Sequence, residues 1–211
     1  MDRKKFRKLT EKENATHAQL IEQGTDFHNG KPDIKVAQIA RRAKALFGNG
    51  ALVIDVGGGQ GRNAFPFLTR GHRVILTDIS RVALKAAQRK AAALNVEKNL
   101  KTKQVNGVNQ TIGRMGKKAH VVICSRMLHF YTPLIRDALL KQIQEKTLAG
   151  GINVVITHLK HDEARGAFRN AGELKELYRG WKINLTIGEV KRSKISGKKL
   201  GRLITLVARK A

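Results

Sequence analysis

The stretch that most constrains the fold is VIDVGGGQGRN, residues 53 to 63, in which an apolar run leads into four glycines within five positions. Glycine adopts backbone conformations that other residues avoid, and it lets a ligand approach the main chain closely. A turn of this kind, between the first strand of an α/β sheet and a helix, would also present free backbone N–H groups at the helix start. The stretch therefore predicts a ligand site at the end of the first strand.

The remaining sequence alternates short β-branched runs with longer alanine- and leucine-rich helical ones, which is typical of a mainly parallel sheet covered by helices. We expect one domain over residues 33–211, preceded by an N-terminal arm or lid over 1–32. The last two strands have no helix between them and should pair as an antiparallel hairpin. The expected helices cover 32–47, 62–69, 80–95, 133–148 and 171–181, and the strands 51–56, 72–78, 101–106, 119–125, 152–159, 182–190 and 201–210.

The charge of the chain is its other unusual property. It has 42 Lys and Arg against 16 Asp and Glu, a formal net charge of +26. Such a field attracts anions, so it admits RNA, an acidic partner or a small anionic substrate. The excess is uneven: the only acid between Asp78 and Asp137 is Glu97, and none follows Glu189. No apolar run approaches the ~20 residues of a membrane span, and the charged N-terminus predicts a cytoplasmic location.

The glycine spacing separates three ligand classes. A phosphate-binding P-loop would continue with Gly-Lys-Ser/Thr, whereas Arg62 and Asn63 follow here. A dinucleotide fingerprint needs G-x-G-x-x-G, but Gly57, Gly59 and Gly61 are spaced G-x-G-x-G. That spacing fits the D/E-x-G-x-G-x-G turn of class I S-adenosylmethionine-dependent methyltransferases.

Two acids agree with this assignment. Asp55 lies two residues before the first glycine, as the turn requires. Asp78 ends the second strand, about 20 residues beyond the glycines, where an acid can accept both hydroxyls of a ribose. A strand-terminal Asp is as often a helix N-cap, but Ser80 can cap this helix and leave Asp78 free.

From about residue 45 onward the chain resembles the tellurite-resistance methyltransferase family. DVGGGQGRN resembles that family's D-L-G-C-G-x-G-R-N, GELKELYRGW is similar to G-E-L-x-x-Y-Y-x-x-W, and the end of the chain is similar to the closing A-T-M-L-A-R-K. The resemblance implies a Rossmann-like class I methyltransferase fold with a seven-stranded sheet, and S-adenosyl-L-methionine as cofactor. The implied cofactor-binding residues are Asp55, Gly57, Gly59, Gly61, Arg62, Asn63, Asp78, Ile79, Asn106, Gly107 and Ser125.

Three positions depart from the family pattern. Gly58 replaces a usual Cys, which we expect only to enlarge the available room. Asn106 replaces an Asp that binds the adenine amino group, although an Asn oxygen can still accept that hydrogen bond. Lys191 replaces a His beside an Arg, so the role of Arg192 carries over and the histidine role does not.

Methyl transfer from a sulfonium depends mostly on positioning, and a soft lone pair on tellurium or selenium needs no general base. Arg192, His129 and His158 are the candidate catalytic residues, the histidines as proton acceptors or as walls of the acceptor site. We further expect Arg126, Tyr131 and Lys191 to bind an anionic substrate, because arginine and lysine suit oxyanions. Alternatively, these cations are solvated, Leu128 and Phe130 are core, and His129 lies on the surface. No Cys, Asp or Glu joins the histidines at metal-ligand spacing, so no metal site is expected.

Three functions remain open. The first is methylation of a small soft acceptor such as tellurite or selenite. The second is an RNA-directed methyltransferase, which the charge favours, although the Asn/Asp-Pro-Pro-aromatic tetrad is absent and aromatic residues make up only 5% of the chain. The third is a catalytically degenerate, methyltransferase-like component of a ribonucleoprotein.

Overall fold

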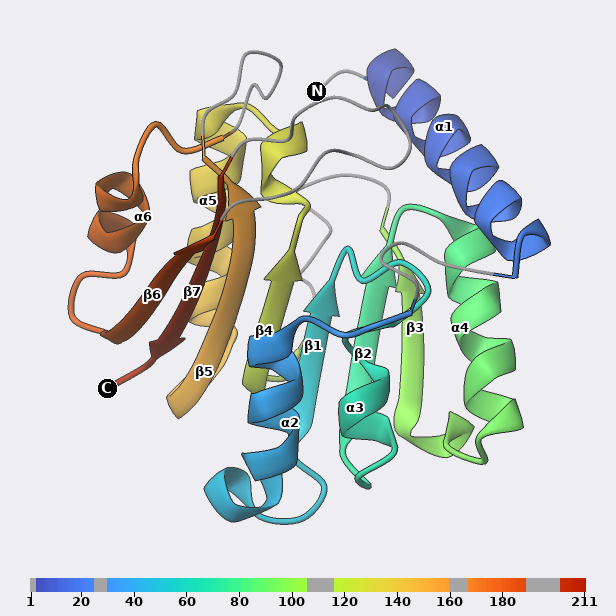
Figure 1. Ribbon diagram of the computed structural model, residues 1–211, viewed down its shortest axis with the longest axis horizontal. Helices are drawn as coiled ribbons and strands as arrows, with labels where there is room; N and C mark the ends of the chain where they lie inside the picture. Colours follow the sequence, from blue (N-terminus) through green and yellow to red (C-terminus); the bar gives the residue numbers. More distant parts are fainter. Residues whose placement is uncertain (1–2, 25–29, 106–115, 160–166, 189–201) are drawn as a thin grey trace.

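The computed structural model shown in Figure 1 describes residues 3–24, 30–105, 116–159, 167–188 and 202–211. Seven strands form one sheet in the order β3-β2-β1-β4-β5-β7-β6, and within it only β7 runs antiparallel to its neighbours. The sequence therefore predicted the fold class correctly, including the C-terminal antiparallel pair. The strands are β1 (Leu52–Val56), β2 (Arg73–Asp78), β3 (Leu100–Gln104), β4 (Ala119–Ser125), β5 (Thr147–His158), β6 (Lys182–Gly188) and β7 (Leu203–Arg209).

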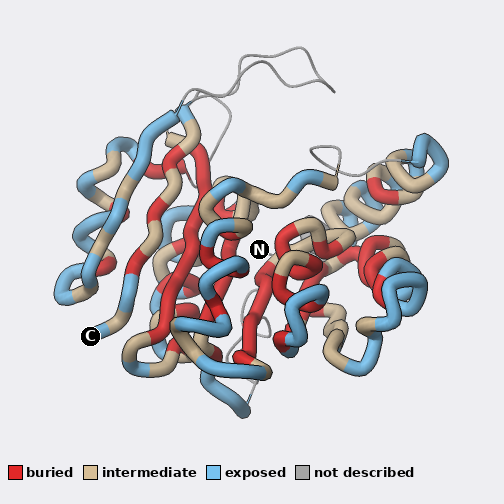
Figure 2. The backbone as a smooth tube through the Cα atoms, turned by 60° about the horizontal axis from the view of Figure 1, so that its bottom comes forward, coloured by how far each residue is buried: buried red, intermediate tan, exposed pale blue. Residues whose placement is uncertain are grey.

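Helices cover both faces of the sheet, and each face has its own apolar core. One core joins α2, α3 and α4 to the sheet through residues such as Val53, and the other joins α5 and α6 through residues such as Ile54. All five residues of β1 are buried, as expected of a central parallel strand (Figure 2). The helices are α1 (Arg3–Glu22), α2 (Ile34–Phe47), α3 (Phe65–Leu68), α4 (Arg81–Ala93), α5 (Pro133–Glu145) and α6 (Ala171–Leu177), with short 3₁₀ turns η1 (Glu97–Asn99) and η3 (Leu128–Phe130).

Several elements differ from the prediction. β5 begins at Thr147, inside the helix expected over 133–148, and α6 ends at Leu177, before its expected end at 181. The expected helix over 62–69 is wrong, because α3 contains only Phe65–Leu68. The turn instead continues to Ala64, closed by hydrogen bonds from Gly61 N to Gly58 O and from Ala64 N to Gly61 O. The N-terminal segment, for which no element was expected, forms the 20-residue helix α1. None of the helices in the described ranges is both long and apolar enough to cross a membrane.

Candidate active site

The glycine turn joins β1 to α3 at the carboxyl edge of the sheet. Gly57, Gly59 and Gly61 all have positive φ, of 65°, 56° and 84°, which L-residues with side chains rarely adopt. Side chains also approach the turn closely. A Cβ added to Gly57 would lie 2.4 Å from Met127 Sδ, and one added to Gly59 would lie 3.1 Å from His17 Cε1. These positions therefore need glycine for two reasons: the backbone conformation, and the close approach of the Met127 and His17 side chains to the turn.

Asp55 is completely buried beneath this turn. Within the described ranges, neither of its carboxylate oxygens has a hydrogen-bond partner. A Cβ on Gly58 would lie 2.5 Å from Asp55 Oδ2 and 2.4 Å from Leu76 Cδ1. The expectation that Gly58 enlarges the available room is therefore wrong, because the Asp55 and Leu76 side chains fill that space.

Burial raises the pKa of Asp55 to about 7, since the lost hydration outweighs the attraction of Arg62, and the nearby Asp78 and Asp33 raise it further. A buried acid without a partner is costly unless a ligand supplies a donor. Asp55 is thus a group that a bound cation or hydrogen-bond donor would stabilise.

Asp78 ends β2 next to the same turn. Its Oδ2 accepts a hydrogen bond from Gly59 N at 2.8 Å, and its Oδ1 accepts one from Ser80 N at 2.8 Å. Ser80 caps α4 by accepting a hydrogen bond from Ala83 N at 3.1 Å, which confirms that Asp78 is not needed as the cap. Burial raises the pKa of Asp78, and these backbone bonds oppose the rise. Each oxygen of the carboxylate retains a lone pair for a further donor, such as a hydroxyl.

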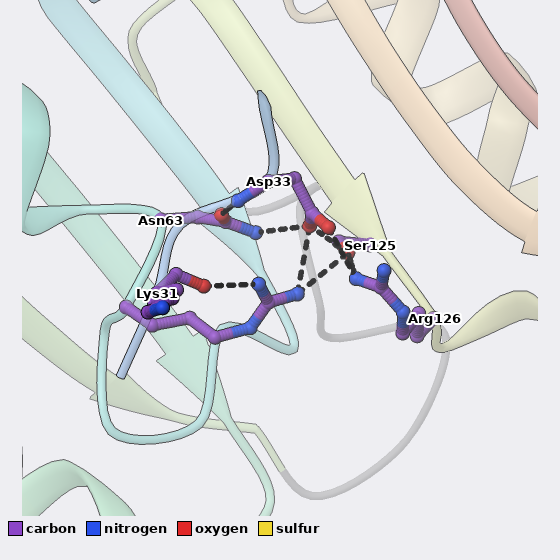
Figure 3. A network of polar contacts seen from close by, with 6 residues as sticks. Lys31, Asp33, Asn63, Ser125 and Arg126 are labelled. Atoms are coloured by element: carbon purple, nitrogen blue, oxygen red, sulfur yellow. Dashed lines mark hydrogen bonds and ion pairs between the residues drawn. The ribbon is translucent and has the colours of Figure 1, made fainter. Parts of the chain in front are cut away.

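On the other side of the turn, Asp33 gathers several of the predicted site residues (Figure 3). Its Oδ1 lies 2.6 Å from Arg126 Nη1, and its Oδ2 lies 2.7 Å from Arg62 Nη2. Oδ2 also accepts hydrogen bonds from Ser125 Oγ at 2.8 Å and from Asn63 Nδ2 at 3.1 Å. Burial alone would raise the pKa of Asp33, but the two guanidinium groups lower it to about 2. The network therefore fixes Arg62 and Arg126 about one ionised carboxylate.

Arg126 adopts the left-handed conformation, with φ of 55°. This is uncommon for a residue with a side chain, and such residues cluster at functional sites. Its Nη1 contacts Asp33 and Ser125, while the remaining nitrogens of its guanidinium have no hydrogen-bond partner in the described part of the chain. With Asp33 neutralising one of the two arginines, the cluster has a net charge of +1. It can accept a singly charged anion.

The two predicted histidines meet at the same edge of the sheet. His129 lies on η3 and His158 ends β5, and their rings pack edge to face with centroids 5.0 Å apart. The alternative assignment of this segment to the core is correct for Leu128, which is buried, but wrong for Phe130, which is 52% exposed. Tyr131 is buried in the apolar core on the α5 face.

The other predicted residues divide into two groups. Ile79 directly follows β2, and its carbonyl oxygen accepts a hydrogen bond from Gln104 Nε2 at 3.0 Å. Asn106, Gly107, Lys191 and Arg192 lie outside the described residues, so their roles stay predictions. In the ranges that the structure describes, no three His, Cys, Asp or Glu side chains are grouped as a metal site would need.

Asp33, Met127 and His17 also lie at the site but were not predicted from the sequence. Asp33 directly precedes α2, at the N-cap position, yet its side chain makes no capping hydrogen bond. Nothing in the local sequence distinguishes it from an ordinary cap. His17 comes from a helix without a recognised motif, and Met127 has no sequence signal that separates it from its apolar and aromatic neighbours.

Comparison with known proteins agrees with this arrangement. Residues 53–151 match the family model of a methyltransferase domain. No curated protein sequence matches the chain significantly.

Solved structures share the fold at low sequence identity. TehB from Haemophilus influenzae is 21% identical with a TM-score of 0.67, and the alignment covers 82% of this chain but only 62% of TehB. Magnesium protoporphyrin IX methyltransferase (ChlM) from Synechocystis PCC 6803, solved with bound SAH, is 18% identical with a TM-score of 0.63, over 84% of this chain and 82% of that one. A putative rRNA methylase from Clostridium thermocellum is 16% identical with a TM-score of 0.58, over 83% of this chain and 96% of that one.

The residues present fit the cofactor that this fold binds. An unpartnered buried carboxylate lies at Asp55, a turn of positive-φ glycines follows it, and Asp78 ends the next strand. S-Adenosylmethionine carries a cationic sulfonium, an ammonium group and a ribose diol. These groups would supply the positive charge and the hydrogen-bond donors that the two carboxylates can still accept. Residues 53–151 thus match a methyltransferase domain, and the sheet order and this turn are those expected of a class I S-adenosylmethionine-dependent methyltransferase.

Proposed function

We propose that this methyltransferase transfers the methyl group to a small, singly charged anion with a soft nucleophilic atom, for which tellurite and selenite are the test acceptors. The observation that carries the proposal is the cluster of Arg62 and Arg126 around Asp33, which has a net charge of +1 and lies beside the glycine turn. The resemblance to the tellurite-resistance family and the shared fold of TehB support the choice of acceptor.

Each part of the site has a separate task in this proposal. Asp55, the glycine turn and Asp78 would hold the cofactor, which supplies a methyl carbon already activated by a sulfonium. Arg126 orients the acceptor's oxygens through its remaining N–H donors, so that a lone pair of the soft atom can face the methyl group. His129 and His158 exclude water and can take a proton from an acceptor that carries one.

The proposal is tested by mixing the purified protein with methyl-labelled cofactor and either selenite or tellurite. Arg126→Lys keeps the charge but loses the planar fork, so we expect KM for the acceptor to rise about tenfold with little change in KM for the cofactor. Arg179→Lys is the matched control, because Arg179 is exposed and, among the residues that the structure describes, forms an ion pair with Glu176 alone. Tight cofactor binding without transfer to either acceptor would refute the proposal.

A second candidate, an RNA-directed methyltransferase, is favoured by the edge of the sheet at β3. Four cations at this edge are exposed and form no ion pair with any described residue: Lys85 and Arg89 on α4, Lys98 on η1 and Lys101 on β3. The only acid near them in the sequence is Glu97, so this edge can contact phosphates. Label incorporated into RNA, lost in the variant with these four residues changed to Gln, would support this candidate. Retention of RNA without incorporation would count against it.

A further inference from the structure

Helix α1 lies outside the matched domain and beside α4 (Figure 1), and its His17 lies close to Gly59 of the glycine turn. Asn14 Oδ1 accepts a hydrogen bond from Ser80 Oγ at 2.8 Å and a longer one from Val82 N at 3.4 Å. These contacts fix the helix to the start of α4, immediately after Asp78. The docking is therefore specific, since it uses the Oγ of the residue that caps α4.

One turn further along α1, His17 lies on the same side of the helix as Asn14. Its side chain is buried, with only 3% of the residue exposed, and its ring is the group nearest to a Cβ built on Gly59. Gly59 N in turn donates to Asp78 Oδ2. The imidazole thus covers the point at which the glycine turn and the β2 carboxylate meet.

Glu13 extends the same side of α1 toward Asp78. Burial raises the pKa of Glu13, and the charge of Asp78 raises it further. Two carboxyl groups whose charges repel each other would be stabilised by a ligand that donates a hydrogen bond to each of them. A ribose diol has that chemistry, because it brings two hydroxyl donors and no charge.

We propose that Glu13, Asn14 and His17 of α1 form the outer wall of the ribose subsite, so that the N-terminal helix is part of the cofactor site. Asn14 is a positioning residue that fixes the helix, and His17 packs against the bound nucleoside. This inference rests on the cofactor binding at the glycine turn as set out above. It adds residues that the matched domain, which begins at residue 53, does not contain.

The test is calorimetric titration of the full chain with S-adenosylhomocysteine, together with its dissociation rate by stopped flow. We expect Asn14→Ala and His17→Ala each to weaken binding about tenfold, mostly through faster dissociation, which is the size expected for one lost hydrogen bond or one lost packing contact. Gln19→Ala, an exposed position on the same helix, should bind as the unchanged protein does.

The direction in which the affinity for S-adenosylhomocysteine changes decides between the alternatives. If both variants bind more tightly, α1 blocks the site and is not a wall of it, which overturns the proposal. If both bind as the unchanged protein does, α1 has no part in cofactor binding, and the proposal is also overturned while the methyltransferase assignment stands. If the unchanged protein itself does not bind S-adenosylhomocysteine, the cofactor site and the proposed function fail together.

Discussion

Replacing Asp55 with Asn should stabilise the ligand-free protein at neutral and alkaline pH. The pKa of this carboxyl is about 7 in the fold, against roughly 4 in an unfolded chain. The folded state therefore retains a proton that the unfolded state has released, and stability falls as pH rises from about 4 to about 7. Three pKa units correspond to about 4 kcal/mol, an upper value that relaxation around the charge would lower.

Asparagine has nearly the same shape and stays neutral at every pH. At pH 4 the protonated acid and the amide are both neutral and both without partners, so the two proteins should be similarly stable. At pH 8 the variant should be more stable by about 1 to 4 kcal/mol, because it has no buried charge to desolvate. The same change should weaken S-adenosylhomocysteine binding, since the amide cannot attract the cofactor's ammonium as a carboxylate does.

The measurement is urea unfolding of both proteins between pH 4 and pH 8, without ligand. Other groups also titrate in this range, so the quantity of interest is the difference between the two curves. Glu97→Gln removes one negative charge from an exposed position and serves as the control. Curves for Asp55→Asn and the unchanged protein that run parallel over the whole range would refute this prediction, because they would show that Asp55 does not retain its proton in the fold.

Two further changes follow from the same geometry. Asp33→Asn leaves Arg62 and Arg126 facing each other without their counter-ion, and should cost about 3 kcal/mol of stability in urea unfolding at pH 7. The unchanged protein should lose a similar contribution on acidification from about pH 5 to pH 2, because the pKa of Asp33 is lowered to about 2, and equal acid sensitivity of both proteins would contradict this. Gly59→Ala and Gly48→Ala both place a side chain at positive φ, but only the first meets a neighbour, His17; both should lose about 1 to 2 kcal/mol of stability. Only Gly59→Ala should lose S-adenosylhomocysteine binding in calorimetry, and equal losses in both would contradict the assigned site.

The fold and the cofactor end of the site could be predicted from the sequence because their signals are local. Asp55, the three glycines and Asp78 lie within 24 residues, on two strands whose apolar character is unambiguous. Parallel pairing of β1 with β2 then brings the two acids to one edge of the sheet. The spacing of the motif was sufficient because the chain between its parts is regular.

The charge network could not be predicted, because its members come from three separate segments. Asp33 precedes α2, Arg62 follows the turn, and Arg126 follows β4, so residues 92 or 93 positions apart meet at one carboxylate. In a chain with 42 Lys and Arg residues, no sequence pattern indicates which arginines are buried. The helix expected over 62–69 was too long for a related reason. Gly58 N donates to Thr77 O on β2, and local bonds from Gly61 N to Gly58 O and from Ala64 N to Gly61 O extend the turn, so tertiary and turn contacts override helix propensity.

The arrangement of charge along the edge of the sheet also bears on how the proposed reaction would release its products. In the proposed reaction, the donor end would have three acids, Glu13, Asp55 and Asp78, whose pKa values are all raised, whereas the acceptor end would have two arginines about one acid. Transfer of a methyl group from a sulfonium to an anion removes one positive charge at the first end and one negative charge at the second. Both ends therefore bind the reactants more strongly than the products, since each loses its attraction to a charge that the reaction has cancelled. This difference in affinity favours product release. The methyl transfer itself requires no proton transfer when the nucleophile is a soft lone pair.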